Sequence, residues 1–186
     1  MRGEIKDFKE SLRRRVALLQ GVPVEALQQV YDERLKLNPG AAELVSACKA
    51  AGLKVLLVSG GFTFFANRVK ERLGIDFARS NLLDEAHGKL TGRVVQQSWG
   101  DICDGAEKRR TLREVASLLG ISLGETIAMG DGANDLPMMA EAGLSVAGLS
   151  ICYHGKPAVR EQAMISIEDG GMDRALALFD QAAPAG

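Results

Sequence analysis

Two short apolar segments, each followed at once by glycines and a polar side chain, constrain the fold of this chain more than any other feature. Residues 53–58 lead into Ser59-Gly60-Gly61, and residues 126–129 lead into Gly130-Asp131-Gly132. Short apolar runs with such ends are typical of strands buried on both faces of a parallel sheet. Helical patterns alternate with them, so the sequence predicts an α/β fold with a parallel sheet flanked by helices.

Helix and strand patterns alternate along most of the chain. Apolar periodicity predicts helices over residues 7–20, 23–31, 64–73, 105–119 and 134–142, with others beginning near Asn38, Pro157 and Met172. Further strands are predicted over residues 144–147 and near Ile165, and a strand or hairpin that turns at His87-Gly88 over residues 81–95. Only helical patterns occur before residue 39, so we expect residues 1–38 to form a lobe separate from residues 39–186.

Composition and charge exclude several classes of protein. The 186 residues include 23 Lys and Arg against 24 Asp and Glu, which lacks the basic excess of a nucleic-acid-binding protein. No apolar run approaches the roughly 18 residues that cross a membrane, and the first residues do not form a signal peptide. Three isolated cysteines argue against a disulfide scaffold or a zinc site. We therefore expect a soluble, cytoplasmic protein that binds neither nucleic acid nor membranes.

Polar groups follow both predicted strands, and ligands of open parallel sheets bind outside the carboxyl ends of the strands. Ser59 and Gly60 offer a hydroxyl and backbone N–H groups to an anion, although a tight turn also explains them. Asp131 and Asp135 are two carboxylates four residues apart, which suits a Mg²⁺ ion that keeps several waters. The alternative is an Asp-Gly turn followed by a helix cap from Asn134 or Asp135.

Lys108 lies in the first turns of a predicted helix, where its positive charge opposes the helix dipole. This placement indicates that the charge faces an anion. Arg109 and Arg110 lie beside it in the sequence, and a solvated basic surface would explain all three residues without a site.

The segments occur in the order strand-Ser-Gly-Gly, helix lysine, and strand-Gly-Asp-Gly followed by an Asn-Asp pair. In order and content they resemble motifs two, three and four of the haloacid dehalogenase-type phosphatases, and most specifically the members that hydrolyse O-phosphoserine. The segments that carry the resemblance are residues 1–5, 11–16, 57–62, 89–92, 130–136 and 156–157. The resemblance implies a Rossmann-like haloacid dehalogenase sheet over residues 39–186 and a remnant of a small helical cap over residues 1–38.

The resemblance also implies roles for individual residues of the core. Residues matching Ser59 and Gly60 hold the phosphoryl group, and the lysine matching Lys108 offsets negative charge. The aspartate matching Asp131 binds Mg²⁺, and the amide matching Asn134 touches phosphate or substrate. Phosphoryl transfer depends mainly on positioning and charge neutralisation, so these residue types suit the reaction.

Further implied roles concern the lysine's partner and the cap. The acid matching Asp135 orients the lysine or supports the metal shell. In the cap, Arg15 matches an arginine that pairs with the substrate carboxylate, and Phe8 and Met1 match residues that lie over the amino acid. The implied reaction is Mg²⁺-dependent hydrolysis of O-phosphoserine to serine and phosphate, the last step of serine biosynthesis.

One part of the family pattern is absent from the chain. The reaction of these enzymes begins at the first aspartate of an Asp-x-Asp-x-Thr segment, and this chain has no Asp-x-Asp. Met1 falls inside the cap in the resemblance, so we expect the first core strand to be missing. Three interpretations stay open: a phosphatase of this type, with or without turnover as written; a non-catalytic remnant that binds phosphate or a partner; and half of a split assembly. An incomplete sheet would favour association with another chain.

Overall fold

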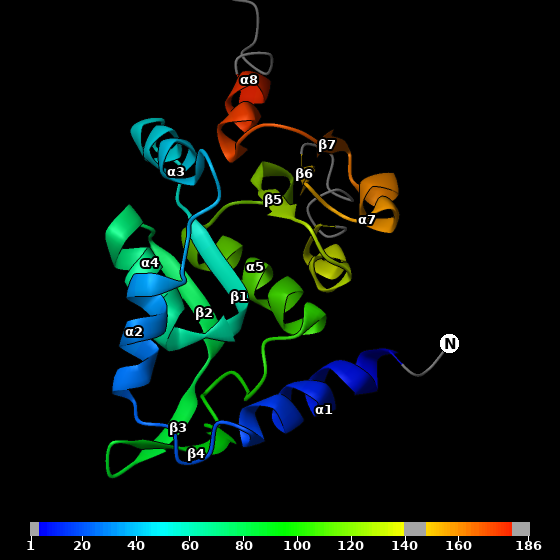
Figure 1. The fold of residues 1–186 in the computed structure, drawn as a ribbon. Coiled ribbons are helices and arrows are strands. Elements are labelled where there is room, and N and C mark those ends of the chain that lie inside the picture. The colour runs from blue at the N-terminus through cyan, green and yellow to red at the C-terminus, as the bar shows by residue number, and fades with distance from the viewer. Residues whose placement is uncertain (1–3, 140–147, 180–186) are drawn as a thin grey trace, which may run out of the picture. The chain divides into compact units, whose positions relative to one another are not determined.

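The computed structural model describes residues 4–139 and 148–179 (Figure 1). The chain divides into two compact units. The first unit comprises residues up to 36 with 57–72 and 77–104, and the second comprises residues 37–56, 73–76 and those from 105 onward. The first break lies close to the boundary expected at residue 38. The assignment of 1–38 to a cap and of 39–186 to a core stays a prediction.

The first unit combines helices with two small sheets. Its elements are α1 (Glu4–Ala17), α2 (Glu25–Glu33), β1 (Leu56–Phe62), α4 (Thr63–Leu73), β2 (Phe77–Asn81), β3 (Leu83–Ala86) and β4 (Lys89–Val94). β1 pairs with β2, and β3 pairs with β4 as an antiparallel hairpin. The hairpin turns at His87 and Gly88, whose φ angles of 54° and 75° are both left-handed. The predicted turn at this position is confirmed.

Helix α1 buries one apolar face in the core of the first unit. Leu12 and Val16 are buried against Ile102, and the half-buried Phe8 packs on the same cluster. Residues four apart lie above one another on a helix, which explains why these side chains share a face. The predicted apolar face is therefore confirmed, although the helix ends at Ala17 rather than at residue 20.

The second unit is built on a three-stranded parallel sheet with the order β5-β6-β7. Its elements are α3 (Ala41–Ala50), α5 (Gly105–Leu119), η1 (Leu123–Glu125), β5 (Ile127–Gly130), η2 (Ala133–Asp135), β6 (Leu149–Tyr153), α7 (Pro157–Gln162), β7 (Ile165–Ile167), η3 (Met172–Ala175) and α8 (Leu176–Phe179). Its parallel strands and the helices between them confirm the predicted α/β class. No helix within the described ranges is long and apolar enough to span a bilayer.

Helices cover both faces of this sheet, and the central strand β6 shows why. Successive side chains of a strand point to opposite faces. Cys152 packs into a cluster with Leu112 of α5 and Val159 of α7, whereas Ile151 packs into another cluster with Ala175 of η3. Both Cys152 and Ile151 are fully buried. β6 is therefore apolar on both sides, as expected of a strand in the middle of a parallel sheet.

Both predicted boundaries of the strand over residues 53–58 are wrong, because β1 begins only at Leu56. β1 does not end at residue 58 but continues through Ser59, Gly60 and Gly61 to Phe62, because these residues stay in the strand that pairs with β2. β2 is absent from the sequence prediction. Its residues Phe-Ala-Arg-Ser-Asn do not alternate regularly between apolar and polar, so the local pattern is weak.

The strand after η2 shows the effect of a local repeat. The sequence reads Ala-Gly-Leu-Ser at residues 142–145 and again at 147–150, and the strand is predicted over 144–147. Those residues, like the end of the predicted helix 134–142, lie outside the described part of the chain. The described strand β6 uses the second copy, pairing Leu149 with Ile127 and Ser150 with Ala128. The two copies give the same local signal, so the sequence alone does not predict the pairing of Leu149 and Ser150 with β5.

Helix α3 begins later than predicted. The sequence favours Asn38 as the N-cap and Pro39 as the first helical residue, but the helix begins at Ala41 with Gly40 as its N-cap. Gly40 has a φ of 78°, and a Cβ there would lie 2.6 Å from the backbone nitrogen of Asp173. The Pro39 carbonyl meanwhile accepts a hydrogen bond from the N–H of Met172. Contact with the distant η3 segment thus fixes the start of the helix.

Candidate active site

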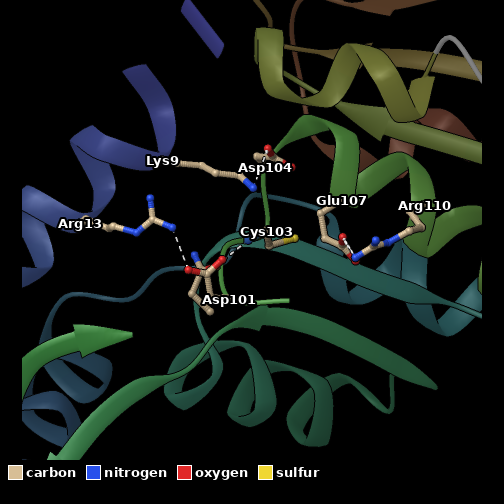
Figure 2. Close-up of polar contacts among 8 residues, drawn as sticks. Lys9, Arg13, Asp101, Cys103, Asp104, Glu107 and Arg110 are labelled. Carbon is tan, nitrogen blue, oxygen red and sulfur yellow. Dashed lines mark hydrogen bonds and ion pairs between the residues drawn. The ribbon is translucent and has the colours of Figure 1, made fainter. Parts of the chain in front are cut away.

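A buried ion pair forms the centre of the candidate site in the second unit. The Lys108 Nζ lies 2.6 Å from Oδ1 of Asp135, and each residue is only 6% exposed. Lys108 comes from the first turn of α5 and Asp135 from the end of η2, 27 positions later. Burial separates Lys108 from the exposed Arg109 and Arg110, so a solvated basic surface does not explain it. The same helix buries Glu107, which pairs with Arg110 (Figure 2).

The second carboxylate oxygen of Asp135 fixes the loop that follows β5. Oδ2 accepts hydrogen bonds from the backbone N–H groups of Asp131 and Gly132, both at 3.1 Å. Gly130 leaves room for this carboxylate, since a Cβ there would lie 2.6 Å from the same oxygen. Asp135 therefore joins the lysine to the loop. It also accepts from the N–H of Gly132, which is the N-cap of η2 in place of the predicted Asn134 or Asp135.

The backbone of Asp131 is held from its other side as well, whereas its side chain is exposed. The N–H of Lys156 donates to the Asp131 carbonyl at 3.4 Å, and a Cβ on Gly155 would lie 3.0 Å from that carbonyl. Asn134 is half-buried, and its carbonyl lies close to the start of α5 at Gly105. The loop thus presents the Asp131 carboxylate outward from a fixed backbone.

The described donors suit a metal that takes few protein ligands. Both Asp135 oxygens are already used, which leaves Asp131 as the candidate ligand of this loop. Across residues 4–139 and 148–179, no group of three or more His, Cys, Asp or Glu side chains could hold a metal ion. Mg²⁺ is commonly held by one or two carboxylates, with waters and substrate phosphate completing its shell, so Asp131 fits as one ligand.

In the first unit, the predicted anion-binding residues lie at the end of β1. The hydroxyl oxygen of Ser59 accepts a hydrogen bond from the Gly61 N–H at 3.0 Å. The Gly60 carbonyl accepts one from Nδ2 of Asn81 at 2.9 Å, and Oδ1 of Asn81 accepts one from the Cys103 N–H at 2.7 Å. Asn81 is fully buried, and no sequence pattern indicates its role, because a single asparagine carries no local signal for such distant partners.

The predicted cap residues have different surroundings. Phe8 packs on the core cluster that contains Leu12 and Val16 of α1, so it has a structural role. Arg15 is exposed, and its Nε donates to the Ser11 carbonyl at 3.4 Å. Met1 lies outside the described residues. The structure therefore brings Lys108 and the 131–135 loop together within the second unit.

Two ion pairs connect α1 to the segment that precedes α5 (Figure 2). Arg13 bonds Asp101 at 2.8 Å, and Lys9 lies 3.7 Å from Asp104. The hydrogen bond from Arg13 is the main reason why the pKa of Asp101 is below its usual value. These pairs, together with Asn81, tie the 101–104 segment to the first unit.

Comparison with known proteins assigns the chain to a family. The family model of haloacid dehalogenase-like hydrolases matches residues 2–140. The chain belongs to the haloacid dehalogenase-like hydrolases, and its Ser59, Lys108 and Asp131 segments lie inside the matched range.

Its relatives narrow the assignment. The chain is 67% identical to a phosphoserine phosphatase of Albidiferax ferrireducens and 66% identical to one of Polaromonas sp., in each case over 96% of this chain and 73% of the relative. A probable phosphoserine phosphatase from Vibrio cholerae, solved without ligand, superposes with a TM-score of 0.86 and 40% identity over 95% of this chain. This chain spans 51% of that protein's length. The predicted assignment to the phosphoserine phosphatases, which are phosphoric monoester hydrolases, is confirmed, as is the haloacid dehalogenase-like fold.

Proposed function

We propose that this chain carries the phosphate-, lysine- and metal-binding part of a phosphatase that hydrolyses O-phosphoserine to serine and phosphate. The buried Lys108–Asp135 pair beside Asp131 is the observation that supports it most directly. A buried ammonium held by a fixed carboxylate is a preorganised charge that does not have to reorient when phosphate binds. A merely structural pair would not require the adjoining loop to present an exposed carboxylate.

Within this proposal each residue has a definite task. Lys108 offsets the charge of the phosphoryl group, and Asp135 holds Lys108 and the loop in place. Ser59 and the Gly60 backbone hold the phosphoryl oxygens, and Asn134 contacts phosphate or substrate. These tasks are positioning and charge neutralisation, which dominate phosphoryl transfer.

The remaining tasks concern the metal and the amino-acid end of the substrate. Asp131 is a ligand of Mg²⁺, which when bound neutralises charge on the phosphate oxygens. Arg15, which is exposed, pairs with the substrate carboxylate, and Phe8 and Met1 lie over the amino acid. The partner of the site is thus a small molecule, and we place the reaction in serine biosynthesis in the cytoplasm.

Phosphate release from O-phosphoserine with Mg²⁺ tests the proposal, with Asp131→Asn and the matched control Glu161→Gln measured in parallel. Glu161 is an exposed carboxylate on α7 of the same unit. We expect release that falls by at least about a hundredfold in Asp131→Asn, because a metal ligand is lost, and stays unchanged in the control. Equal activity in all three proteins would contradict the role of Asp131.

A non-catalytic or split protein is the second candidate, because the chain contains no Asp-x-Asp segment. The sheet order leaves β5 at an edge among the described strands, with Ile127 41% exposed, and an edge strand can accept another strand. This candidate predicts binding of Mg²⁺ and phosphate without turnover. Sedimentation of the folded chain, together with an activity assay, separates a silent monomer from an assembly.

A further inference from the structure

Asn81 uses both ends of its side-chain amide although it is fully buried at the end of β2. Its Nδ2 donates to the Gly60 carbonyl at 2.9 Å, and its Oδ1 accepts the Cys103 N–H at 2.7 Å. These partners lie 21 residues before it and 22 residues after it. One neutral side chain therefore joins the end of β1 to the 101–104 segment, which α1 contacts through two ion pairs.

The peptide unit between Gly60 and Gly61 is held at both ends. The C=O and N–H of a trans peptide point in opposite directions, and the described chain has no cis peptide. The Asn81 amide donates to the Gly60 C=O of this peptide group. The Ser59 hydroxyl oxygen accepts a hydrogen bond from the Gly61 N–H of the same group at 3.0 Å. Glycine on both sides would otherwise let the peptide rotate with little steric cost.

The Ser59 hydroxyl is oriented by the same arrangement. A hydroxyl has one proton to donate and two lone pairs that accept. Because the oxygen of Ser59 accepts from Gly61, its own proton is left to donate to another group. If this peptide group flipped, the Gly61 N–H would no longer donate to the Ser59 hydroxyl, and the Gly60 carbonyl would face the hydroxyl instead.

We propose that Asn81 is a positioning residue for phosphate binding, acting through the Gly60–Gly61 peptide and the Ser59 hydroxyl. This inference rests on the proposed function, in which Ser59 and Gly60 hold the phosphoryl group. The requirement is for an amide: aspartate at position 81 would keep the acceptor for Cys103 but place a carboxylate oxygen against the Gly60 carbonyl.

A matched control is available in the same unit. Gln97 is another amide side chain, and its Nε2 donates to the Ser80 carbonyl at 2.9 Å. Gln97→Glu therefore removes an amide-to-carbonyl hydrogen bond to β2, whereas Asn81→Asp removes one to β1. Gln97 is half-buried whereas Asn81 is fully buried, so this variant controls for the loss of an amide-to-carbonyl bond in the first unit and not for the burial of a charge.

The experiment is a titration of the full chain with inorganic phosphate in the presence of Mg²⁺, followed by amide NMR signals. Hydrogen exchange of the Gly61 N–H is measured on the same samples. For Asn81→Asp we expect a phosphate Kd about tenfold higher and faster Gly61 exchange, whereas Gln97→Glu should change neither by more than about twofold. If Asn81→Asp does not fold, Asn81→Leu replaces it, since leucine has a similar size and no charge.

The outcomes separate the two proposals. A wild-type chain that does not bind phosphate contradicts the proposed function, and with it the role of Asn81 in that binding. Binding by the wild type with unchanged Kd and unchanged Gly61 exchange in the Asn81 variant overturns the inference alone. An equal loss in Gln97→Glu also overturns it, because the effect would then belong to the stability of the unit.

Discussion

The two units hold their candidate phosphate-binding groups in different ways. In the second unit, a buried charge pair between Lys108 and Asp135 fixes the loop, and Gly130 leaves space for the carboxylate. In the first unit, the neutral Asn81 amide and the Ser59 hydroxyl fix a glycine peptide. Removing one member of a buried charge pair leaves an uncompensated charge, whereas removing a neutral hydrogen bond leaves a smaller penalty. We therefore expect substitutions at the buried pair of the second unit to lower stability more than substitutions at the Asn81 site of the first unit.

The largest expected effect is that of Lys108→Met. The substitution keeps a long side chain but leaves the Asp135 carboxylate buried without its partner, which should lower the free energy of unfolding by about 3–5 kcal/mol. Urea unfolding measures the loss. The double variant Lys108→Met/Asp135→Asn should recover part of it, because no buried charge remains. If Lys108→Met lowers the free energy of unfolding by less than Asn81→Leu does, the second unit is not the less tolerant of substitution.

A pair of glycine substitutions sharpens the same comparison. A Cβ at Gly130 would lie 2.6 Å from the fixed Oδ2 of Asp135, whereas a Cβ at Gly61 would lie 3.1 Å from the Ser59 hydroxyl, which ends a short side chain. We expect Gly130→Ala to lower the free energy of unfolding by about 2 kcal/mol and Gly61→Ala by less than about 1 kcal/mol. Thermal unfolding of both variants tests this order, and a reversed order would show that the 59–61 backbone is the tighter of the two.

The smallest expected effects are on the pH dependence of stability. They distinguish a carboxylate bound mainly by a backbone N–H from a carboxylate bound mainly by an ion pair. The Val55 N–H is the main cause of the lowered pKa of Asp76 in the second unit, and Lys49 adds to it. Arg13 is the main cause of the lowered pKa of Asp101 in the first unit. A lowered folded pKa means stability that is present above the unfolded value near 3.9 and is lost as pH falls through the folded pKa.

At pH 7, Asp76→Ala should therefore lower the free energy of unfolding by about 1–2 kcal/mol, and Asp101→Ala by less than about 1 kcal/mol. Both differences from the wild type should shrink as the pH is lowered through about 4. Added salt should reduce the Asp101 effect more, because ion pairs near the surface are screened. Urea unfolding between pH 3 and pH 7 measures both, and a pH-independent difference would contradict the assigned cause.

Local sequence determined much of this protein. The predicted helix over 105–119 is α5, the turn at His87-Gly88 is present, and the strand before Gly130 is β5 within one residue. These elements depend on periodicity, glycine and turn residues that act over a few positions, so a single sequence shows them. The same local patterns predict Lys108 in the first turn of a helix and two carboxylates after a strand.

Tertiary structure decided what those residues meet. The pairing of Lys108 with Asp135 spans 27 residues, and the two bonds of Asn81 span 21 and 22. The pairing of Leu149 in β6 with Ile127 in β5 likewise joins residues that are not neighbours in the sequence. Burial and hydrogen-bond partners are set by which distant segments pack together, because a buried polar group needs a partner wherever the chain supplies one. No local pattern carries that information.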